Sequence, residues 1–211
     1  MLPLDVKEFI EKNIDRITNA EFESLFYDAL HANDGVRNVG QVTEALLQAG
    51  IDPLDSITSV PSLYLDGALY IRHLSVPQHV KNIKNVGFGF SALESIDLHP
   101  MCELSTACFR NSDKLGSIKI PDIMNEVPEE CFYGCTGLKH VDLAQVEQIA
   151  SEAFAHCVSL KEIVIPDCIE YISDSAFYAA PYVCFVVSAD NEYAIRYAQE
   201  NNIELKVVDR V

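Results

Sequence analysis

The chain has 211 residues, of which 49% are apolar, and it carries a formal net charge of −17 at neutral pH. This length holds one or two domains with enough apolar material for a core, and no apolar run approaches the roughly 20 residues of a membrane span. A chain this acidic repels DNA, RNA and anionic membranes, so we expect no direct contact with nucleic acid or membrane and a partner protein with a basic surface.

Residues 1–60 have the apolar spacing of helices and form the first predicted domain. Three short amphipathic stripes follow one another along this segment. They consist of Val6, Phe9, Ile10, Ile14 and Ile17, of Phe22, Leu25, Phe26, Ala29 and Leu30, and of Val39, Val42, Leu46 and Ala49. Helices this short need a surface against which to bury their stripes. They either cap the open edge of the following segment, shielding its first strand, or form a separate module that docks a partner.

An apolar pattern recurs every 22 or 23 residues within residues 61–187, the second predicted domain. Each copy has a leucine, two strand residues, a further aliphatic residue and a phenylalanine. The leucine column is Leu93, Leu115, Leu138, Leu160 and Tyr182, the further aliphatic column is Ile83, Leu104, Val127, Ile149 and Ile172, and the aromatic column is Phe109, Phe132, Phe154 and Phe177. A repeat of this length cannot bury its apolar face alone, so neighbouring copies must stack into a solenoid.

One strand per repeat is predicted from the alternation of apolar and polar residues, as in the run from His140 to Leu143. Successive strands return in the same direction, so they form a parallel ladder with the polar residues on its outer side. We expect this strand face to bind the partner through Asp97, Lys119, His140, Asp142, Glu162, Val164 and Val186. The two valines would form a small apolar patch there, unless the C-terminal segment folds over them.

The last segment, residues 188–211, is predicted to close the other end of the solenoid. A helix is expected from Asp190 to about Asn201, and a final strand follows in which Ile203, Leu205 and Val207 alternate with polar residues. This helix and strand together form the third predicted region.

At these residues the chain resembles the BspA-like leucine-rich repeat family. The resemblance covers about residues 69–208 and rests on the Phe-x-x-Cys-x-x-Leu runs at Phe132 and Phe154, although Ser112 takes the cysteine position in an earlier copy. It implies a curved solenoid that binds other molecules, usually proteins, and carries no catalytic residues. The expected fold is therefore an α/β repeat solenoid: a leucine-rich repeat with a short parallel β-ladder, a helical N-terminal cap and a helix–strand C-terminal cap.

The seven cysteines bear on metal sites and on the cellular compartment. Cys135 and Cys157 share one column of the repeat, and we expect them to be small buried residues of the core. Cys131 and Cys135 are spaced as one half of a zinc site, but no second pair follows, so no metal site is predicted. Scattered thiols fit a reducing cytosol, and the first residues lack a secretory signal, so a cytoplasmic protein is expected.

No residue set in the sequence has the pattern of an active site. His140 and Asp142 could act as an acid–base pair, but alternate strand residues point outward, and two solvated groups explain them better. We therefore predict a non-enzymatic, intracellular protein-interaction module without a cofactor. The alternative is an acidic inhibitor that occupies the nucleic-acid-binding surface of a basic partner protein, and a phage is one origin considered for it.

Overall fold

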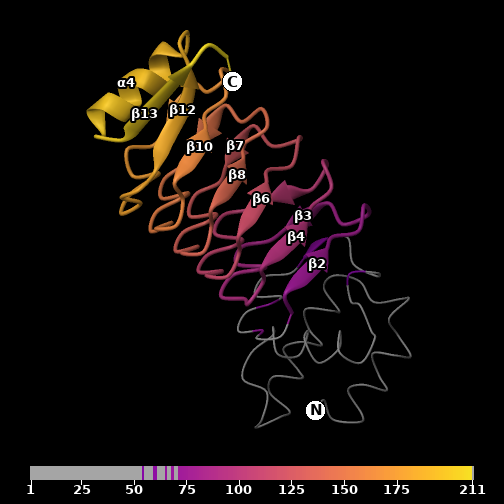
Figure 1. The fold of residues 1–211 in the computed structure, drawn as a ribbon. Helices are drawn as coiled ribbons and strands as arrows, with labels where there is room; N and C mark the ends of the chain where they lie inside the picture. Colours follow the sequence, from indigo (N-terminus) through magenta and orange to yellow (C-terminus); the bar gives the residue numbers. More distant parts are fainter. Residues whose placement is uncertain (1–53, 55–58, 61–64, 66–67, 69–70, 211) are drawn as a thin grey trace, which may run out of the picture.

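The computed structural model describes residues 54, 59–60, 65, 68 and 71–210. The three predicted N-terminal helices lie outside these residues. The described chain is a solenoid of short coils stacked along one axis, with a helix and a strand at its C-terminal end (Figure 1). The division of the chain near residues 60 and 187 stays a prediction.

The first row of strands confirms the predicted parallel ladder. Its members are β2 (His73–Ser75), β4 (Ser95–Asp97), β6 (Ser117–Lys119), β8 (His140–Asp142), β10 (Glu162–Val164), β12 (Cys184–Ser188) and β13 (Glu204–Val208). Parallel pairing joins β2 to β4, β6 to β8, and β10 to β12 and β13. In β4, β6, β8 and β10 the central residue is buried, so the apolar residue of each strand enters the core and its neighbours face outward.

A second row of strands runs along another side of the same coils, and the prediction of one strand per repeat is wrong on this point. The row consists of β1 (Ser59–Val60), β3 (Asn82–Ile83), β5 (Glu103–Leu104), β7 (Glu126–Val127), β9 (Gln148–Ile149) and β11 (Tyr171–Ile172). These strands pair in parallel as β1–β3–β5 and β7–β9–β11. From β3 to β11 their second residues are the predicted aliphatic column, and all are buried. Two residues are too few for an alternating pattern, so the strands themselves were not foreseen.

The phenylalanine column stacks as predicted, and Phe88 extends it by one coil. Neighbouring ring centroids lie 5.5 Å apart for Phe88 and Phe109, then 5.4, 5.4 and 5.3 Å along Phe132, Phe154 and Phe177. The last three pairs are nearly parallel, with interplanar angles of 8° to 15°. Each coil therefore stacks one ring on the ring of the next coil, which gives the solenoid a continuous aromatic core.

Each phenylalanine sits in a tight turn flanked by left-handed backbone. For the first four phenylalanines, the residues two places before and two places after the ring both have a positive φ. For Phe177 only the residue two places after it does. These residues are Val86 and Phe90, Ala107 and Asn111, Glu130 and Gly134, Glu152 and His156, and Ala179, with φ between 53° and 69°. An L-residue in this region costs roughly 1–2 kcal/mol, and only one of the nine is glycine. Hydrogen bonds between coils, such as the 2.7 Å bond from the Asn111 amide to the Tyr133 carbonyl, hold these turns in place.

The cysteine column is buried as predicted, and it makes a ladder of hydrogen bonds to the aromatic turns. The thiols of Cys135 and Cys157 donate to the carbonyls of Phe109 and Phe132 in the preceding coils, at 3.0 and 3.2 Å. Ser112 donates to the Phe88 carbonyl at 2.6 Å. The serine at position 112 therefore preserves the contact, because its hydroxyl donates to the equivalent buried carbonyl of its own neighbouring coil.

The C-terminal cap is a helix and a strand, as expected, but two residues differ from the prediction. Helix α4 (Glu192–Glu200) is capped by Asn191, which accepts a 3.0 Å hydrogen bond from the Ala194 amide. Tyr182 is 67% exposed and leaves the leucine column, whose place in the core falls to Val183. Val207 is 53% exposed because β13 is the last strand of the described solenoid, so no further coil covers it.

Candidate functional site

The strand face consists of the outward residues of the first row of strands. Asp97, Lys119, His140, Asp142, Glu162 and Val164 are all exposed on it, whereas Val186 is half-buried. Parallel pairing places Lys119 opposite Asp142 and Val164 opposite Val186. The structure thus brings the predicted residues onto one surface, spread over coils about 4.8 Å apart.

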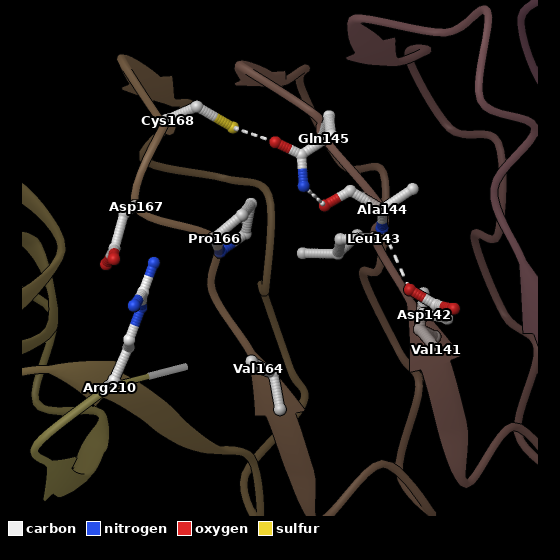
Figure 2. Close-up of a pocket in the computed structure, with 10 residues that line it drawn as sticks. All are labelled: Val141, Asp142, Leu143, Ala144, Gln145, Val164, Pro166, Asp167, Cys168 and Arg210. Carbon is white, nitrogen blue, oxygen red and sulfur yellow. Dashed lines mark hydrogen bonds between the residues drawn. The ribbon is translucent and has the colours of Figure 1, made fainter.

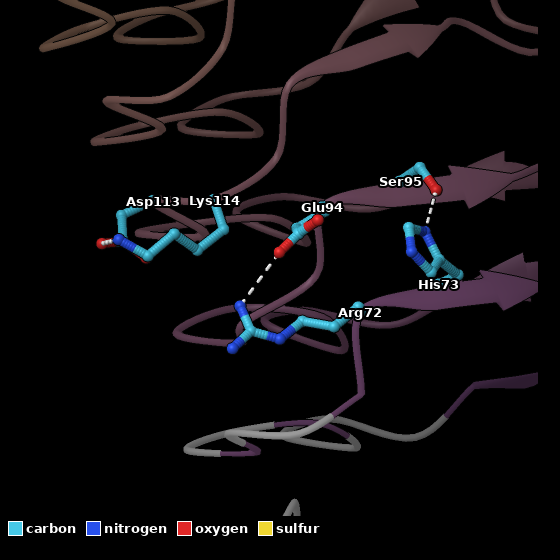
Figure 3. A network of polar contacts seen from close by, with 6 residues as sticks. All are labelled: Arg72, His73, Glu94, Ser95, Asp113 and Lys114. Atoms are coloured by element: carbon cyan, nitrogen blue, oxygen red, sulfur yellow. Dashed lines mark hydrogen bonds and ion pairs between the residues drawn. The ribbon is translucent and has the colours of Figure 1, made fainter.

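In its N-terminal coils the strand face is occupied by polar groups that bind one another (Figure 3). His73 Nδ1 lies 2.7 Å from the Ser95 hydroxyl, and the Ser75 hydroxyl donates to Asp97 at 2.9 Å. Beside them Arg72 pairs with Glu94 at 3.1 Å. Asp97, which was predicted to bind the partner, therefore already accepts a hydrogen bond from Ser75 of the neighbouring coil.

Lys119 occupies the middle of the strand face and is also paired. Its ammonium group lies 3.0 Å from a carboxylate oxygen of Asp122, and this hydrogen bond and charge raise the pKa of Lys119. The charge of Asp142 on the neighbouring strand acts in the same direction. Lys119 therefore stays cationic under the influence of two carboxylates.

A groove of about 770 Å³ opens at the C-terminal ends of β8 and β10 (Figure 2). Its lining residues are Val141, Asp142, Leu143, Ala144, Gln145, Val164, Pro166, Asp167, Cys168 and Arg210. The Asp142 carboxylate accepts a 2.9 Å hydrogen bond from the Ala144 amide, which holds it at the rim. Val164 is 48% exposed, and Figure 2 shows Arg210 directed toward Asp167. The groove combines an apolar surface with charges of both signs.

A second hollow of about 550 Å³ lies at the opposite ends of β10, β12 and β13. Glu162 and Lys206 line it and form a 3.5 Å ion pair, although β12 lies between their strands. The pair spans Cys184 and Val186, which explains why Cys184 is buried and Val186 only half-exposed. The C-terminal segment thus extends the sheet beside β12, and Val164 stays open.

Cys184 does not have the environment of a nucleophile. Burial raises the pKa of its thiol, and the charges of Glu204 and Glu162 add to this effect against the opposing charge of Lys206. A reactive cysteine needs the reverse, a lowered pKa in a partly exposed position. His140 and Asp142 remain exposed neighbours on one strand. Among the described residues, no group of three or more His, Cys, Asp or Glu side chains could hold a metal ion.

Part of the groove was missed by reasoning from the sequence. Asp142 and Val164 were predicted, but Gln145, Asp167 and Arg210 were not. Asp167 follows the proline after β10, so its position just beyond a predicted strand could have placed it at the end of the strand face. Arg210 carried no such signal, because it reaches the groove only through the course of the chain beyond β13.

The second row of strands carries an acidic flank that was also missed. It comprises residues 101–107, 124–130, 146–152 and 169–175, which contain no lysine or arginine. Its carboxylates are Glu103, Glu126, Glu129, Glu130, Glu147, Glu152, Glu170 and Asp174. Of these, only Glu130 forms a described ion pair, with Arg110 from outside the flank. The same stretch is acidic in the four repeats from β5 to β11, whereas around β3 it holds Lys81 and Lys84, so aligning the repeats would have revealed the flank.

Comparison with known proteins places this fold among leucine-rich repeats. The profile of the BspA type leucine rich repeat region matches residues 58–183 in six copies. A leucine rich cell surface protein from Faecalibacterium prausnitzii A2-165 is 27% identical, with a TM-score of 0.54 over 64% of this chain and 38% of its own. A leucine-rich repeat protein from Bacteroides ovatus is 22% identical, with a TM-score of 0.56 over 73% of this chain and 46% of its own, and supports the fold alone. The chain thus spans less than half of either solved chain, and no curated protein matches it.

These comparisons correct the expected cellular location. The prediction of a cytoplasmic protein is wrong, because the similar protein from Faecalibacterium is a cell surface protein. The prediction had rested on scattered thiols and on the first residues of the sequence, and neither observation identifies a compartment. Within the described part of the chain, no helix is both long enough and apolar enough to cross a bilayer.

Proposed function

The chain belongs to the BspA-type leucine-rich repeat family, whose repeats generally serve as protein-interaction modules, and we propose that it captures a protein partner at the cell surface through the groove on its strand face. The binding residues in this proposal are Asp142, Val164 and Arg210 in the groove, together with Glu162, which lies two residues before Val164 on the outer side of β10. Capture requires no covalent chemistry, and we propose a non-enzymatic role.

The observation that carries the proposal is the exposure of Val164 inside a groove bordered by charged side chains. Interfaces often have an apolar centre and a polar rim, and here Val164 would supply the centre and Asp142, Asp167 and Arg210 the rim. In the described N-terminal coils, by contrast, the polar groups of the strand face already bind one another.

Charge suggests the chemistry of the partner. Asp142 and Asp167 line the groove with carboxylates, against the single cation Arg210, and the whole chain carries −17. A partner segment with lysine or arginine beside an apolar side chain would match this arrangement. Opposite charges across the rim would mainly accelerate association and select the partner.

The proposal is tested with the triple variant Asp142→Asn, Glu162→Gln, Val164→Ser in quantitative capture from extracts of the native cell and its surroundings, followed by mass spectrometry. We expect the amount of partner retained to fall about tenfold or more, because truncating a hot-spot residue at the centre of an interface costs about 2 kcal/mol and 1.4 kcal/mol is already tenfold. An unchanged set of retained proteins would contradict a role for the groove.

The acidic flank provides a matched control for this experiment. The variant Glu103→Gln, Glu126→Gln also removes two negative charges from the solenoid but leaves the groove intact. It should retain the partner at nearly the wild-type level. Both variants should show the far-UV circular dichroism spectrum and the melting temperature of the wild type, because all the replaced side chains but Val164 are charged and exposed.

The acidic flank itself supports a second candidate function, in which the protein inhibits a partner by covering its basic, nucleic-acid-binding surface. Eight carboxylates without a lysine or arginine, repeated over four coils, are the observation that favours it. In this case the two variants exchange roles: the flank variant would lose the partner and the groove variant would keep it. Binding would also weaken steeply between low and high salt, as expected for contacts between exposed charges.

A further inference from the structure

The residue before each stacked phenylalanine belongs to a column that has room only for small side chains. The column is Gly87, Cys108, Cys131, Ala153 and Ala176, and all five residues are buried. A Cβ atom at Gly87 would lie 2.8 Å from Ile83 Cγ2, which shows how closely the chain packs there. Cysteines occupy two adjacent places in a column otherwise restricted to glycine and alanine.

These two thiols face each other across neighbouring coils. The sulfur atoms of Cys108 and Cys131 are 3.4 Å apart, and both side chains are fully buried. The Phe109 amide donates a 2.9 Å hydrogen bond to the Cys131 carbonyl, which fixes the register of the two coils. Coils spaced about 4.8 Å apart place the two Cα atoms within the range of 4.4–6.8 Å that disulfides span.

The other buried cysteines near the aromatic turns are bound differently. Cys135 and Cys157 direct their thiols to the carbonyls of Phe109 and Phe132, and each shares this role with Ser112 in its column. A thiol engaged with a backbone carbonyl of the preceding coil serves the structure as a hydrogen-bond donor. Cys108 and Cys131 instead have each other's sulfur as the side-chain partner.

We propose that Cys108 and Cys131 are a disulfide-forming pair that clamps two successive coils of the solenoid. The reaction is thiol–disulfide exchange with a low-molecular-weight disulfide such as oxidised glutathione. The Cys108 thiolate attacks the oxidant and forms a mixed disulfide while one glutathione thiol leaves. The Cys131 thiolate then attacks the Cys108 sulfur, forms the S–S bond between the coils and releases the second glutathione thiol. The two cysteine protons end on the two glutathione thiols, and the two cysteines are oxidised as the glutathione disulfide is reduced.

Burial decides when this reaction takes place. In the folded chain neither sulfur is accessible, and burial raises the pKa of the Cys131 thiol, so an external oxidant meets little reactive thiolate. The bond therefore forms while the coils are still opening and closing during folding. Once formed, it is shielded from reductants by the same burial. A cell surface location would supply an oxidising setting, although the pairing geometry does not depend on it.

The test is to refold the full chain from denaturant in a buffer with oxidised and reduced glutathione, and in parallel with excess reductant. We expect the first product to have lost two hydrogen atoms by mass and to retain five of its seven thiols. Peptide mapping should join Cys108 to Cys131. The melting temperature should rise by roughly 5–10 °C over the reduced protein, because the bond closes a loop of about two dozen residues.

Two variants separate this pair from the other thiols. Cys131→Ala has the residue that the same column holds at 153 and 176, and it should fold but lose both the cross-link and the gain in melting temperature. Cys157→Ser keeps a donor to the Phe132 carbonyl and should still form the cross-link. The proposal is overturned if the oxidised wild type folds with all its thiols free, or if mapping joins either cysteine to Cys102, Cys135 or Cys157.

Discussion

The two rows of strands belong to the same coils and share one core, yet their outer surfaces differ in chemistry. The strand face mixes carboxylates, lysines, histidines and an exposed valine, and it is hollowed beside β8 and β10. The acidic flank repeats carboxylates in every coil from β5 to β11 without a basic residue. The inward residues of both rows are constrained by stacking, whereas the outward residues are not, so a single solenoid can present two independent surfaces.

The largest expected effect tests whether the two rows share one core. Leu160→Ala, in the coil of β10, and Ile149→Ala, in β9, should each lower the free energy of unfolding by about 2–5 kcal/mol, because both side chains are fully buried and would leave a cavity. Urea denaturation followed by circular dichroism measures both. If one variant were as stable as the wild type, its row would not contribute to a common core.

Alkaline pH should destabilise the core through its buried thiols. Burial raises the pKa of Cys102 and of Cys157 from 9.0 to about 12, so the folded state retains a proton that the unfolded chain releases. This stability is fully present below pH 9 and is lost as pH rises through 12. At about pH 10.5 we expect a loss of roughly 2 kcal/mol per thiol.

Reduced protein, melted at several pH values, provides the measurement. Cys157→Ser removes one titrating thiol while keeping a donor for the Phe132 carbonyl, so its melting temperature should fall less between pH 8 and about pH 10.5 than that of the wild type. An identical fall in the two proteins would mean that the ionisation of Cys157 does not contribute.

The ladder from the cysteine column to the aromatic turns should have a smaller effect. Cys135→Ala leaves the buried Phe109 carbonyl without its side-chain donor and should cost about 1–2 kcal/mol. Cys135→Ser should cost less, because Ser112 makes the equivalent bond in the preceding coil. Equal losses in urea denaturation would show that the volume of the side chain matters and the hydrogen bond does not.

The smallest effect concerns the turn that leads from the second row back to the first. Ala179 is exposed and has a φ of 54°, so Ala179→Gly should relieve strain and stabilise the fold by about 0.5 kcal/mol after the entropy of the unfolded glycine is subtracted. Ala153→Gly is the control, since Ala153 is buried and has no left-handed backbone, and it should destabilise instead. Differential scanning calorimetry resolves the two directions.

Several features of the fold and site could be predicted because they repeat. The leucine, aliphatic and phenylalanine columns predicted the buried stacks, and strand alternation predicted that Asp142, Glu162 and Val164 face outward. Features specific to one coil escaped the pattern, since Tyr182 turned outward and Arg210 reached the groove from beyond the last strand. The two-residue strands escaped it for another reason, because two residues are too few to show an alternating pattern.

The sequence by itself determined that the chain is a stacked solenoid with apolar columns, because each short repeat must bury its apolar residues against its neighbours. Only the tertiary structure decided which outward groups meet. The Glu162–Lys206 pair and the groove with Arg210 depend on how adjacent coils are aligned in space. Solvent-facing side chains are free of the stacking constraint, so their contacts follow from the relative placement of the coils and not from the period of the repeat.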